Sequence, residues 1–586
     1  MCGIAGIMTI DGSTPDTAVL DALGRALDHR GPDGHGQHVS GNLGMVQTRL
    51  AIIDLETGDQ PFIDKDLALV ANGEVYNYIE LRAKMDEVDF ATRSDCEPPL
   101  HLYRKHGIDY TDHLRGMYAI AIHDVTAERL VLSRDPFGIK PLYYAETPDG
   151  FAFASEPSAI IKAGIIEATV NPAALTELLQ LQFSCGDETL FSGIKRVLPG
   201  ETLVVEAGRI TSRTRRNALP AAGPVKTEAP AALKQLDDTL NDSVGVHQRS
   251  DVPYGMFFSG GIDSSVLLAM MTRLNDRPVK ALTAGFSGTS AHDERQHARL
   301  VATASGADHI EVDFTEDDFW TLLPKVAAAV DDATADYAVL PTYKLAARAR
   351  KEGLKVVLSG EGGDELFAGY GRYRHACRPW PFMRPMRRRG IFDGLDILRN
   401  SPAGWRDGIA SAETAARLPG RSRLQIAQAT DCADWLPADL LGKLDRCLMA
   451  HGVEGRVPFL DEAMADFAVG LPDHLKIHRR RGKWLLRRWL ETALPEAKPF
   501  ARKRGFTVPV GEWISRDSVR LAEKLAMQPG IAEICRPGAV ESLFKSLHSS
   551  SDKHLGKAAW TLLFYGLWHN ANILGRPSDA NVLDSL

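Results

Sequence analysis

Short apolar runs separated by turn residues dominate the first 200 or so residues. Runs of this length, bounded by Gly, Pro or Asp, are typical of β-strands. Two stretches, Leu20–Leu27 and Tyr78–Met85, instead carry apolar residues at helical spacing. We therefore expect strand layers flanked by helices. The expected strands are Gly3–Met8, Leu67–Ala71, Tyr118–His123, Arg129–Ser133, Leu142–Ala145 and Phe151–Ala154.

The pattern changes at Thr211–Pro230, which is poor in large apolar residues and rich in Ala, Pro and charge. Such a composition is typical of a linker. We expect a first domain over 1–210, a linker over 211–230 and a second domain over 231–586. A new helix is expected to open the second domain at Leu233, Leu236, Leu240 and Val244.

Strand-like runs alternate with a helical pattern in the second half. Gly255–Phe258, Ala281–Phe286 and Lys355–Leu358 are the runs, and Val266–Leu274 has helical spacing. This alternation predicts a parallel α/β sheet, whose ligands lie at the carboxyl ends of its strands. Beyond Tyr370 the pattern predicts mostly helices.

Composition narrows the class of protein. With 586 residues, of which 44% are apolar, the chain can bury two to four domain cores. A formal net charge of -8 argues against general nucleic-acid binding. The seven cysteines form no CxxC pair, which fits a reducing cytosol and disfavours a zinc ribbon. Because no basic leader or run of about 20 apolar residues is present, we expect a cytoplasmic protein.

Cys2 is the first candidate for chemistry. The initiator methionine is commonly removed before a small residue, which would leave Cys2 with a free α-amine. An amine with a pKa near 8 can serve as the base for a thiol with a pKa near 8.5. Taken alone, a cysteine at position two is more often an ordinary buried residue.

Cys2 is followed by a series of motifs in a fixed order. They read MCGIAGIM, HRGPDGHG (His29–Gly36), RLAIID (Arg49–Asp54), NGEVYNY (Asn72–Tyr78), RSDCE (Arg93–Glu97) and RDPFGIKPLYY (Arg134–Tyr144). Over about 200 residues the chain thus resembles the class II glutamine amidotransferases. The resemblance implies an N-terminal-nucleophile αββα sandwich in which Cys2 releases ammonia from glutamine.

The resemblance also implies roles that make chemical sense. A thiolate attacking an amide creates an oxyanion, which needs fixed donors. The Asn72 side chain and the Gly73 N–H are implied to supply them. Arg49 suits the carboxylate of glutamine, and Asp95 and Glu74 suit its ammonium. The implied glutamine-binding residues are Arg49, Leu50, Ala51, Ile52, Ile53, Asn72, Gly73, Glu74 and Asp95.

SGGIDSS (Ser259–Ser265) follows an apolar strand and opens a helical pattern. Open backbone N–H groups, serine hydroxyls and a helix N-terminus together can cradle a pyrophosphate. The loop is not a Walker A motif. It is similar to the SGGxDS loop of the ATP-pyrophosphatases, which cleave ATP to AMP and pyrophosphate; in isolation it would read as a tight strand–helix turn.

A second acidic loop, SGEGGDELFAGY (Ser359–Tyr370), follows another apolar strand. Glu361, Asp364 and Glu365 would repel one another without a nearby cation. Asp263 suits Mg²⁺, which takes a few carboxylates plus phosphate oxygens. Lys483 lies in RRRGKWLLRR, where a solvated basic helix is the plain alternative and a nucleic-acid patch the exotic one. We assign no function to the Arg-rich stretch Arg372–Arg389.

Together the two halves resemble the glutamine-hydrolysing asparagine synthetases along nearly the whole chain. Late motifs, HGVEGRVPFLD and GKWLLRRWL, support the resemblance. It implies that ATP adenylates the aspartate β-carboxylate and that ammonia, moving through an internal passage, attacks the β-aspartyl-AMP. Glu361 and Lys483 are the implied catalytic residues, and Asp263 and Asp364 the implied Mg²⁺ ligands. The implied ATP-binding residues are Phe257, Ser259, Gly260, Gly261, Asp263, Ser264, Ser265, Ala284, Ser359 and Gly360.

The expected partners are glutamine, ATP, aspartate and a second copy of the chain in a homodimer, with no nucleic acid and no membrane. One departure leaves the acceptor open. In Val330–Tyr343, Tyr337 falls where well-known bacterial asparagine synthetases carry an arginine near the substrate. A broader bacterial branch with a similar stretch amidates other carboxylates, such as peptide or cell-envelope precursors, which is the alternative. A non-enzymatic relic is disfavoured because Cys2, Asn72, Asp263 and Glu361 are all intact.

Overall fold

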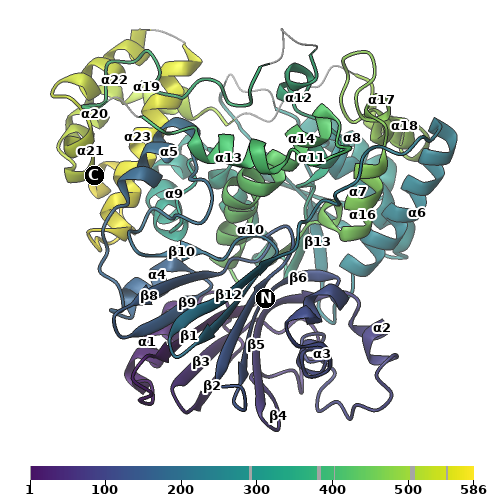
Figure 1. Cartoon of the computed structure of the whole chain (residues 1–586). Helices are drawn as coiled ribbons and strands as arrows, with labels where there is room; N and C mark the ends of the chain where they lie inside the picture. Colours follow the sequence, from purple (N-terminus) through teal and green to yellow (C-terminus); the bar gives the residue numbers. More distant parts are fainter. Residues whose placement is uncertain (1, 290–292, 379–383, 401–402, 502–507, 550–551) are drawn as a thin grey trace.

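The computed structural model describes residues 2–289, 293–378, 384–400, 403–501, 508–549 and 552–586. Its first 215 residues contain two six-stranded antiparallel sheets (Figure 1). The first sheet has the order β10 (Lys195–Arg196), β8 (Tyr143–Thr147), β9 (Gly150–Ala154), β1 (Cys2–Thr9), β3 (Leu43–Arg49) and β2 (Gly34–Ser40). The second has the order β12 (Arg209–Arg215), β11 (Glu201–Glu206), β7 (Arg129–Arg134), β6 (Gly116–Asp124), β5 (Leu67–Val75) and β4 (Phe62–Asp64).

The two sheets face each other across one apolar core. Ile4 and Met45 from the first sheet pack there with Val70 and Leu132 from the second. The outer face of the first sheet is covered by α1 (Thr17–Ala26) and α4 (Pro157–Lys162), and α2 (Tyr78–Arg82) and α3 (Pro98–His106) lie over the second. The next helix, α5 (Pro172–Leu181), lies among helices of the second half of the chain (Figure 1). The layers are helix, sheet, sheet and helix, which confirms the expected αββα sandwich.

A five-stranded parallel sheet forms the centre of the second half. Its order is β15 (Asp308–Asp313), β14 (Lys280–Gly285), β13 (Tyr254–Phe257), β16 (Val356–Leu358) and β17 (Glu454–Arg456). The connecting helices include α6 (Ala229–His247), α7 (Ile262–Leu274), α8 (Arg295–Ser305), α9 (Glu316–Ala329) and α10 (Val339–Lys351). Because β13 and β16 pair in parallel, the loops that follow them meet at one edge of the sheet.

Beyond this sheet the chain is mostly helical, as expected. The helices are α11 (Gly363–Leu366), α12 (Gly371–Ala376), α13 (Asp407–Ala415), α14 (Arg423–Thr430), a π-helix (Asp431–Leu441), α15 (Gly442–Met449), α16 (Glu462–Gly470), α17 (Asp473–Lys476), α18 (Trp484–Ala493), α19 (Val510–Arg516), α20 (Ser518–Ala526), α21 (Pro529–Ile534), α22 (Ala539–Ser549), α23 (Lys553–Asn572) and α24 (Val582–Ser585). Among the described helices, none combines the length and apolar character that crossing a bilayer requires.

The predicted linker 211–230 holds no helix or strand over 216–228, but its first five residues belong to β12 and its last two to α6. The domain division at these residues stays a prediction. Ion pairs and hydrogen bonds cross between the two halves of the chain. Arg115 and Arg216, for example, pair with Asp461 and Glu462.

Candidate active sites

Cys2 stands at the start of β1, next to Asn72 in β5. The Cys2 nitrogen donates a hydrogen bond to Asn72 Oδ1 at 3.1 Å. Asn72 is fully buried, and its Nδ2 has no hydrogen-bond partner among the described residues. A buried donor without a partner is uncommon, because leaving it unsatisfied costs free energy. The amide group of Asn72 is thus fixed beside the thiol with a donor to spare.

The Cys2 side chain is 6% exposed, and its surroundings affect the thiol in opposite ways. Burial raises the pKa of the Cys2 thiol above its usual value. A hydrogen bond from the Leu50 backbone, the Gln47 side chain and the charge of Arg49 each oppose that rise in pKa. The amino-terminal charge gives the largest effect that lowers the pKa of the thiol, and the other groups that favour the thiolate come from the end of β3 and the segment after it.

Gly73 follows Asn72 in β5, and its backbone N–H points away from the neighbouring strand β6. The N–H groups of Ala71 and Val75 point from the same edge of β5 to Gln60 Oε1 at 2.6 Å and Asp95 Oδ2 at 2.8 Å. Alternate residues of a strand point the same way, so the Gly73 N–H lies on this edge between them. A β-carbon at Gly73 would collide with the backbone of β6, so only glycine fits here.

Arg49 and the four residues after it form a buried segment at the end of β3. The Arg49 guanidinium donates to Asp59 Oδ1 at 2.7 Å and to the carbonyl of Asp54. The backbone of Leu50–Ile53 is fixed in turn, because Ala51 N donates to Asp33 Oδ2 at 2.9 Å. The structure therefore brings together the predicted glutamine residues at 49–53 with Cys2, which pairs with Arg49 in the sheet.

Glu74 and Asp95, predicted to bind the glutamine ammonium, are both buried. Burial raises the pKa of each carboxyl group, and for Glu74 the nearby charge of Arg456 opposes this effect. Arg456 Nη2 lies 3.0 Å from Glu74 Oε1. Arg456 belongs to β17 of the parallel sheet, so a residue from the second half of the chain completes the surroundings of this carboxylate.

The SGGIDSS loop lies between β13 and α7, as the sequence predicted. Ser259 Oγ accepts from Gly261 N at 3.2 Å and lies 3.2 Å from Ser264 Oγ. Gly260 has φ of 70°, a left-handed conformation that glycine adopts without strain. The loop therefore turns tightly and directs the N-terminal end of α7 toward the strand edge, where a helix favours anions. Ala284 lies nearby in the adjacent strand β14.

Lys483 lies between the SGGIDSS loop, which carries Asp263, and the SGEGGDELFAGY loop, which carries Asp364. Its Nζ is 2.5 Å from Asp364 Oδ1 and also pairs with Asp263 Oδ2. Burial lowers the pKa of Lys483, but the two carboxylates more than offset this, so the ammonium form is favoured. Lys483 has φ of 55°, an uncommon conformation for a residue with a side chain and one found at functional sites.

Glycines pack tightly around this charge cluster. A β-carbon at Gly369 would collide with Asp364 and with the Lys483 side chain, and one at Gly363 would lie 2.6 Å from Asp263 Oδ1. The spacing of glycines in SGEGGDELFAGY is thus explained by the close approach of Asp263, Asp364 and Lys483. No group of three His, Cys, Asp or Glu side chains that could hold a metal by itself is found in the described residues.

Glu361 and Glu365 in the same loop have different surroundings. Glu361 pairs with the hydroxyl of Ser359, whose backbone N–H is bonded to Arg456 O at 2.8 Å. Glu365 is 1% exposed, accepts from Tyr370 OH at 2.9 Å and has its pKa raised to about 8 by burial and by Asp364. Glu361 therefore stays beside Ser359 at the end of β16, whereas Glu365 is buried against Tyr370.

Tyr337, the residue that departs from the expected arginine, lies beside a buried ion pair. Lys443 Nζ of α15 is 2.8 Å from Asp336 Oδ2. Burial lowers the pKa of Lys443, and Asp336 and Glu361 raise it, so the ammonium form is favoured. The positive charge at this place is therefore supplied by Lys443, within the electrostatic reach of Glu361.

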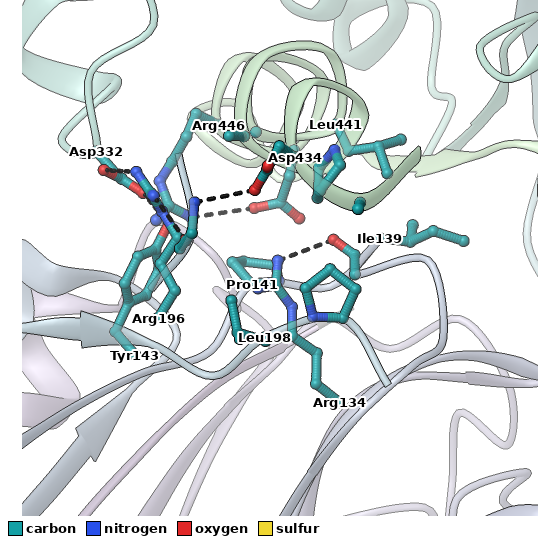
Figure 2. Close-up of a pocket in the computed structure, with 18 residues that line it drawn as sticks. Arg134, Ile139, Pro141, Tyr143, Arg196, Leu198, Asp332, Asp434, Leu441 and Arg446 are labelled. Carbon is teal, nitrogen blue, oxygen red and sulfur yellow. Dashed lines mark hydrogen bonds and ion pairs between the residues drawn. The ribbon is translucent and has the colours of Figure 1, made fainter. Parts of the chain in front are cut away.

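Figure 2 shows a small cavity between the two halves of the chain, with arginines, acids and Tyr143 around it. Its interior volume is about 20 Å³, enough for roughly one water molecule. Arg446 lines it and pairs with Asp331 at 2.7 Å and Asp445 at 3.2 Å. Asp445 also binds Arg30 at 2.8 Å, and Arg30 donates to Cys2 O at 3.3 Å.

The Arg-rich stretch is partly explained by packing. The guanidinium carbon of Arg372 is 3.9 Å from the Tyr370 ring centroid and 4.2 Å from that of Trp435, and its Nε binds Asp431 at 2.7 Å. The guanidinium of Arg387 lies 5.0 Å from the Trp435 ring. These arginines are therefore structural cations on aromatic faces. Residues 379–383, with Trp380 and Phe382, lie outside the described residues.

Sequence reasoning missed several residues of these sites. Gln47 and Lys443 were not noted, and Arg30, Glu454 and Arg456 were noted only as letters of the motifs HRGPDGHG and HGVEGRVPFLD. The second motif was a usable signal, because it places a charged pair on a short buried strand. Which buried partner the charges face depends on the packing of the two halves, which no local pattern contains.

Two models of known protein families match this chain, one in each half. A glutamine amidotransferase domain model matches residues 1–216, and an asparagine synthase model matches residues 235–570. The two matches and the two sites define a glutamine-hydrolysing ligase, with an amidotransferase domain followed by a synthetase domain. The chain belongs to the glutamine-hydrolysing asparagine synthetase family.

Curated relatives match over nearly the full length. Asparagine synthetase 1 of Bacillus subtilis is 32% identical over 98% of this chain and 97% of the relative. A putative asparagine synthetase of Mycobacterium tuberculosis is 32% identical over 97% of each chain. Asparagine synthetase B of Escherichia coli is 29% identical over 88% of this chain and 83% of the relative. Among solved structures, an allosteric regulatory enzyme of purine biosynthesis covers 53% of this chain with 16% identity and a TM-score of 0.29.

Proposed function

We propose that the protein is a glutamine-dependent asparagine synthetase. Similarity to proteins named asparagine synthetase along 97–98% of the chain carries this proposal. The geometry supports it, because a thiol with an oxyanion donor lies in one half and an ATP-pyrophosphatase loop with its lysine in the other. Glutamine, ATP and aspartate are the substrates, and asparagine, glutamate, AMP and pyrophosphate are the products.

In the first half-reaction Cys2, freed of Met1, uses its own amine as base. Its thiolate attacks the side-chain amide carbon of glutamine, and the Asn72 amide and the Gly73 N–H stabilise the oxyanion. The amide nitrogen leaves as ammonia, and water then hydrolyses the thioester to glutamate. Arg49 holds the substrate carboxylate, and Glu74 and Asp95 hold its ammonium.

In the second half-reaction a carboxylate oxygen of aspartate attacks the α-phosphorus of ATP, and pyrophosphate leaves. Lys483 stabilises the developing phosphate charge from its place between Asp263 and Asp364. Ammonia then attacks the β-carbonyl of the acyl-adenylate, Glu361 accepts a proton from the incoming nitrogen, and AMP leaves. The Ser259–Ser265 loop and Ser359–Gly360 orient the phosphates and the nucleotide.

Mg²⁺ fits this site. Lys483 holds a positive charge between Asp263 and Asp364, which shows that the two carboxylates are arranged to share a cation. One or two carboxylates plus phosphate oxygens are the usual ligands of this ion. We propose that Asp263 and Asp364 hold Mg²⁺ when ATP is bound. The ion would neutralise charge on the leaving pyrophosphate.

Ammonia is proposed to pass inside the molecule along α15. This helix carries Asp445 and Arg446 at the cavity of Figure 2 and Lys443 near Glu361. A space on the scale of one small molecule suits ammonia and excludes glutamine or aspartate. A passage shielded from bulk water keeps ammonia unprotonated and nucleophilic.

An assay of acceptor dependence tests the proposal. With glutamine and ATP present, added aspartate should start pyrophosphate release, with one asparagine made for each pyrophosphate. Release that does not respond to aspartate would exclude asparagine synthesis. The second candidate is then the same chemistry on another carboxylate, which Tyr337 and the buried Asp336–Lys443 pair favour because they alter the surroundings of the acceptor.

A further inference from the structure

Arg456 lies at the end of β17, the edge strand of the parallel sheet, and is fully buried. β17 pairs with β16, where Arg456 is the partner of Leu358. One residue later, Ser359 N donates to the Arg456 carbonyl at 2.8 Å. The backbone of Arg456 is therefore fixed directly beside the acidic loop of the synthetase site.

The side chain of Arg456 points the other way, to the glutamine site. Nε donates to Glu454 Oε1 at 2.5 Å, and Nη2 lies 3.0 Å from Glu74 Oε1. Nη1 donates to the carbonyls of His247 at 2.9 Å and Arg249 at 2.6 Å. Hydrogen bonds from Nε and Nη1 fix the orientation of the guanidinium, and this places Nη2 in an ion pair with Glu74.

The guanidinium favours the charged form of Glu74, although burial still holds the pKa of this carboxyl well above its usual value. Burial raises the pKa of the Glu74 carboxyl, Arg456 lowers it, Asp95 and Glu454 raise it, and the amino-terminal ammonium lowers it. Two other carboxylates thus face Glu74, and Arg456 is the side-chain cation that offsets them. Removing Arg456 would raise the pKa of the buried Glu74 carboxyl further and weaken its attraction for a substrate ammonium.

We propose that Arg456 is a positioning residue of the glutaminase reaction: from the synthetase domain, it holds the Glu74 carboxylate ready to receive the glutamine ammonium. The inference rests on the proposed glutaminase function. It means that the glutamine site is complete only when the synthetase domain is packed against the amidotransferase domain. The same residue is bonded through its carbonyl to Ser359, so one amino acid contacts both active sites.

The test compares Arg456→Met, Arg456→Lys and the control Arg216→Met in the full-length chain. Arg216 also makes an ion pair between the two halves, with Glu462 at 2.6 Å, but it touches neither site. Arg456→Met should raise the KM for glutamine by about tenfold or more, because one member of a buried pair is removed. Arg456→Lys should recover part of that loss, and Arg216→Met should leave the KM for glutamine unchanged.

Two further readouts separate positioning from plain destabilisation. In Arg456→Met, the pH below which kcat/KM for glutamine declines should move upward, since Glu74 then protonates more easily. In a double-mutant cycle, adding Arg456→Met to Glu74→Gln should raise the KM for glutamine no further, because both changes remove the same contact. Additive effects, or an unshifted pH profile in soluble Arg456→Met, would overturn the proposal.

A separate measurement distinguishes failure of this inference from failure of the proposed function. Cys2→Ala should have no glutaminase activity. If it keeps activity, the proposed glutaminase chemistry itself is wrong. If Cys2→Ala is inactive and both Arg456 variants keep the wild-type KM for glutamine, only the role of Arg456 is wrong.

Discussion

Asn72 Oδ1 accepts a hydrogen bond from the Cys2 nitrogen at 3.1 Å, which ties the start of β1 to the middle of β5. The contact joins the two sheets of the αββα sandwich at the place where they carry chemistry. It also orients the Asn72 amide, whose Nδ2 is buried and has no partner among the described residues. One side chain thus binds the backbone of the proposed nucleophile and keeps the donor that the proposed oxyanion role requires.

Replacing Asn72 should therefore slow glutamine hydrolysis without affecting ammonia use. We expect Asn72→Ala to lower kcat of the glutaminase reaction by about 10²–10³, the usual effect of losing one oxyanion donor. Steady-state glutamate release measures this. Asn77→Ala is the control, because Asn77 caps neighbouring backbone at His113 and Arg115 instead. Equal losses in the two variants would argue against an oxyanion role.

Cys2→Ala should separate the two half-reactions. The variant lacks the nucleophile, so we expect no glutamate release above background, whereas pyrophosphate release with added ammonium salt should persist. The reason is structural: Asp263, Asp364 and Lys483 are all in the second half of the chain. Loss of both activities would contradict the account of two sites.

Lys483→Met should abolish pyrophosphate release and leave glutamine hydrolysis in place. Lys483→Arg should not restore the activity, because the Lys483 side chain packs against Gly369 with no room for a larger group. Pyrophosphate assays with ammonia as the donor measure this directly. An active Lys483→Arg enzyme would show that only the positive charge is needed.

Removing Lys483 also tests the Mg²⁺ site. The variant leaves Asp263 and Asp364 facing each other without their shared cation, so it should be less stable than wild type. Added Mg²⁺ should then raise the Tm of Lys483→Met by more than it raises the Tm of wild type. If Mg²⁺ raises the Tm of the two proteins equally, the ion does not bind between Asp263 and Asp364. Chelation with EDTA should stop pyrophosphate release while glutamate release continues.

Glu365 gives a pH prediction for stability. Its pKa is raised from 4.5 to about 8, mainly by burial, so the folded state keeps a proton that the unfolded state releases. That contribution is fully present below pH 4.5 and is lost as the pH rises to about 8. The Tm of Glu365→Gln, which does not titrate, should therefore rise relative to wild type between pH 5 and pH 8. A difference in Tm that is constant over this range would contradict the assignment.

The short apolar runs in the sequence predicted much of the fold, because strands that are buried in the core consist mostly of apolar residues. Gly3–Met8 and Leu67–Ala71 lie within β1 and β5, and the runs before SGG and SGE are β13 and β16. β2 was missed, since GHGQHVS alternates half-buried with exposed residues and has almost no apolar signal. The tail of β12 was read as linker, because Arg213 and Arg215 lie on an exposed edge strand.

The site was predictable as far as its residues lie in compact motifs. Cys2 and Asn72 lie on strands of two facing sheets, and the loops at Ser259 and Ser359 follow two parallel strands that pair with each other. Arg456 and Lys443 were not predictable in the same way. Arg456 contacts Glu74 in the other half of the chain, and Lys443 contacts Asp336, which is 107 residues away in sequence. Such pairs form when distant parts of the chain pack together, and the spacing of apolar residues within one segment does not predict them.

Incubation with glutamine labelled with ¹⁵N at the side-chain amide, together with ATP, Mg²⁺ and aspartate, tests the central claim most directly. Mass spectrometry of the products should find asparagine carrying the ¹⁵N label in amounts equal to AMP, even in the presence of unlabelled ammonium at low concentration. Unlabelled asparagine would contradict internal transfer of ammonia. AMP formation without any asparagine would contradict aspartate as the acceptor.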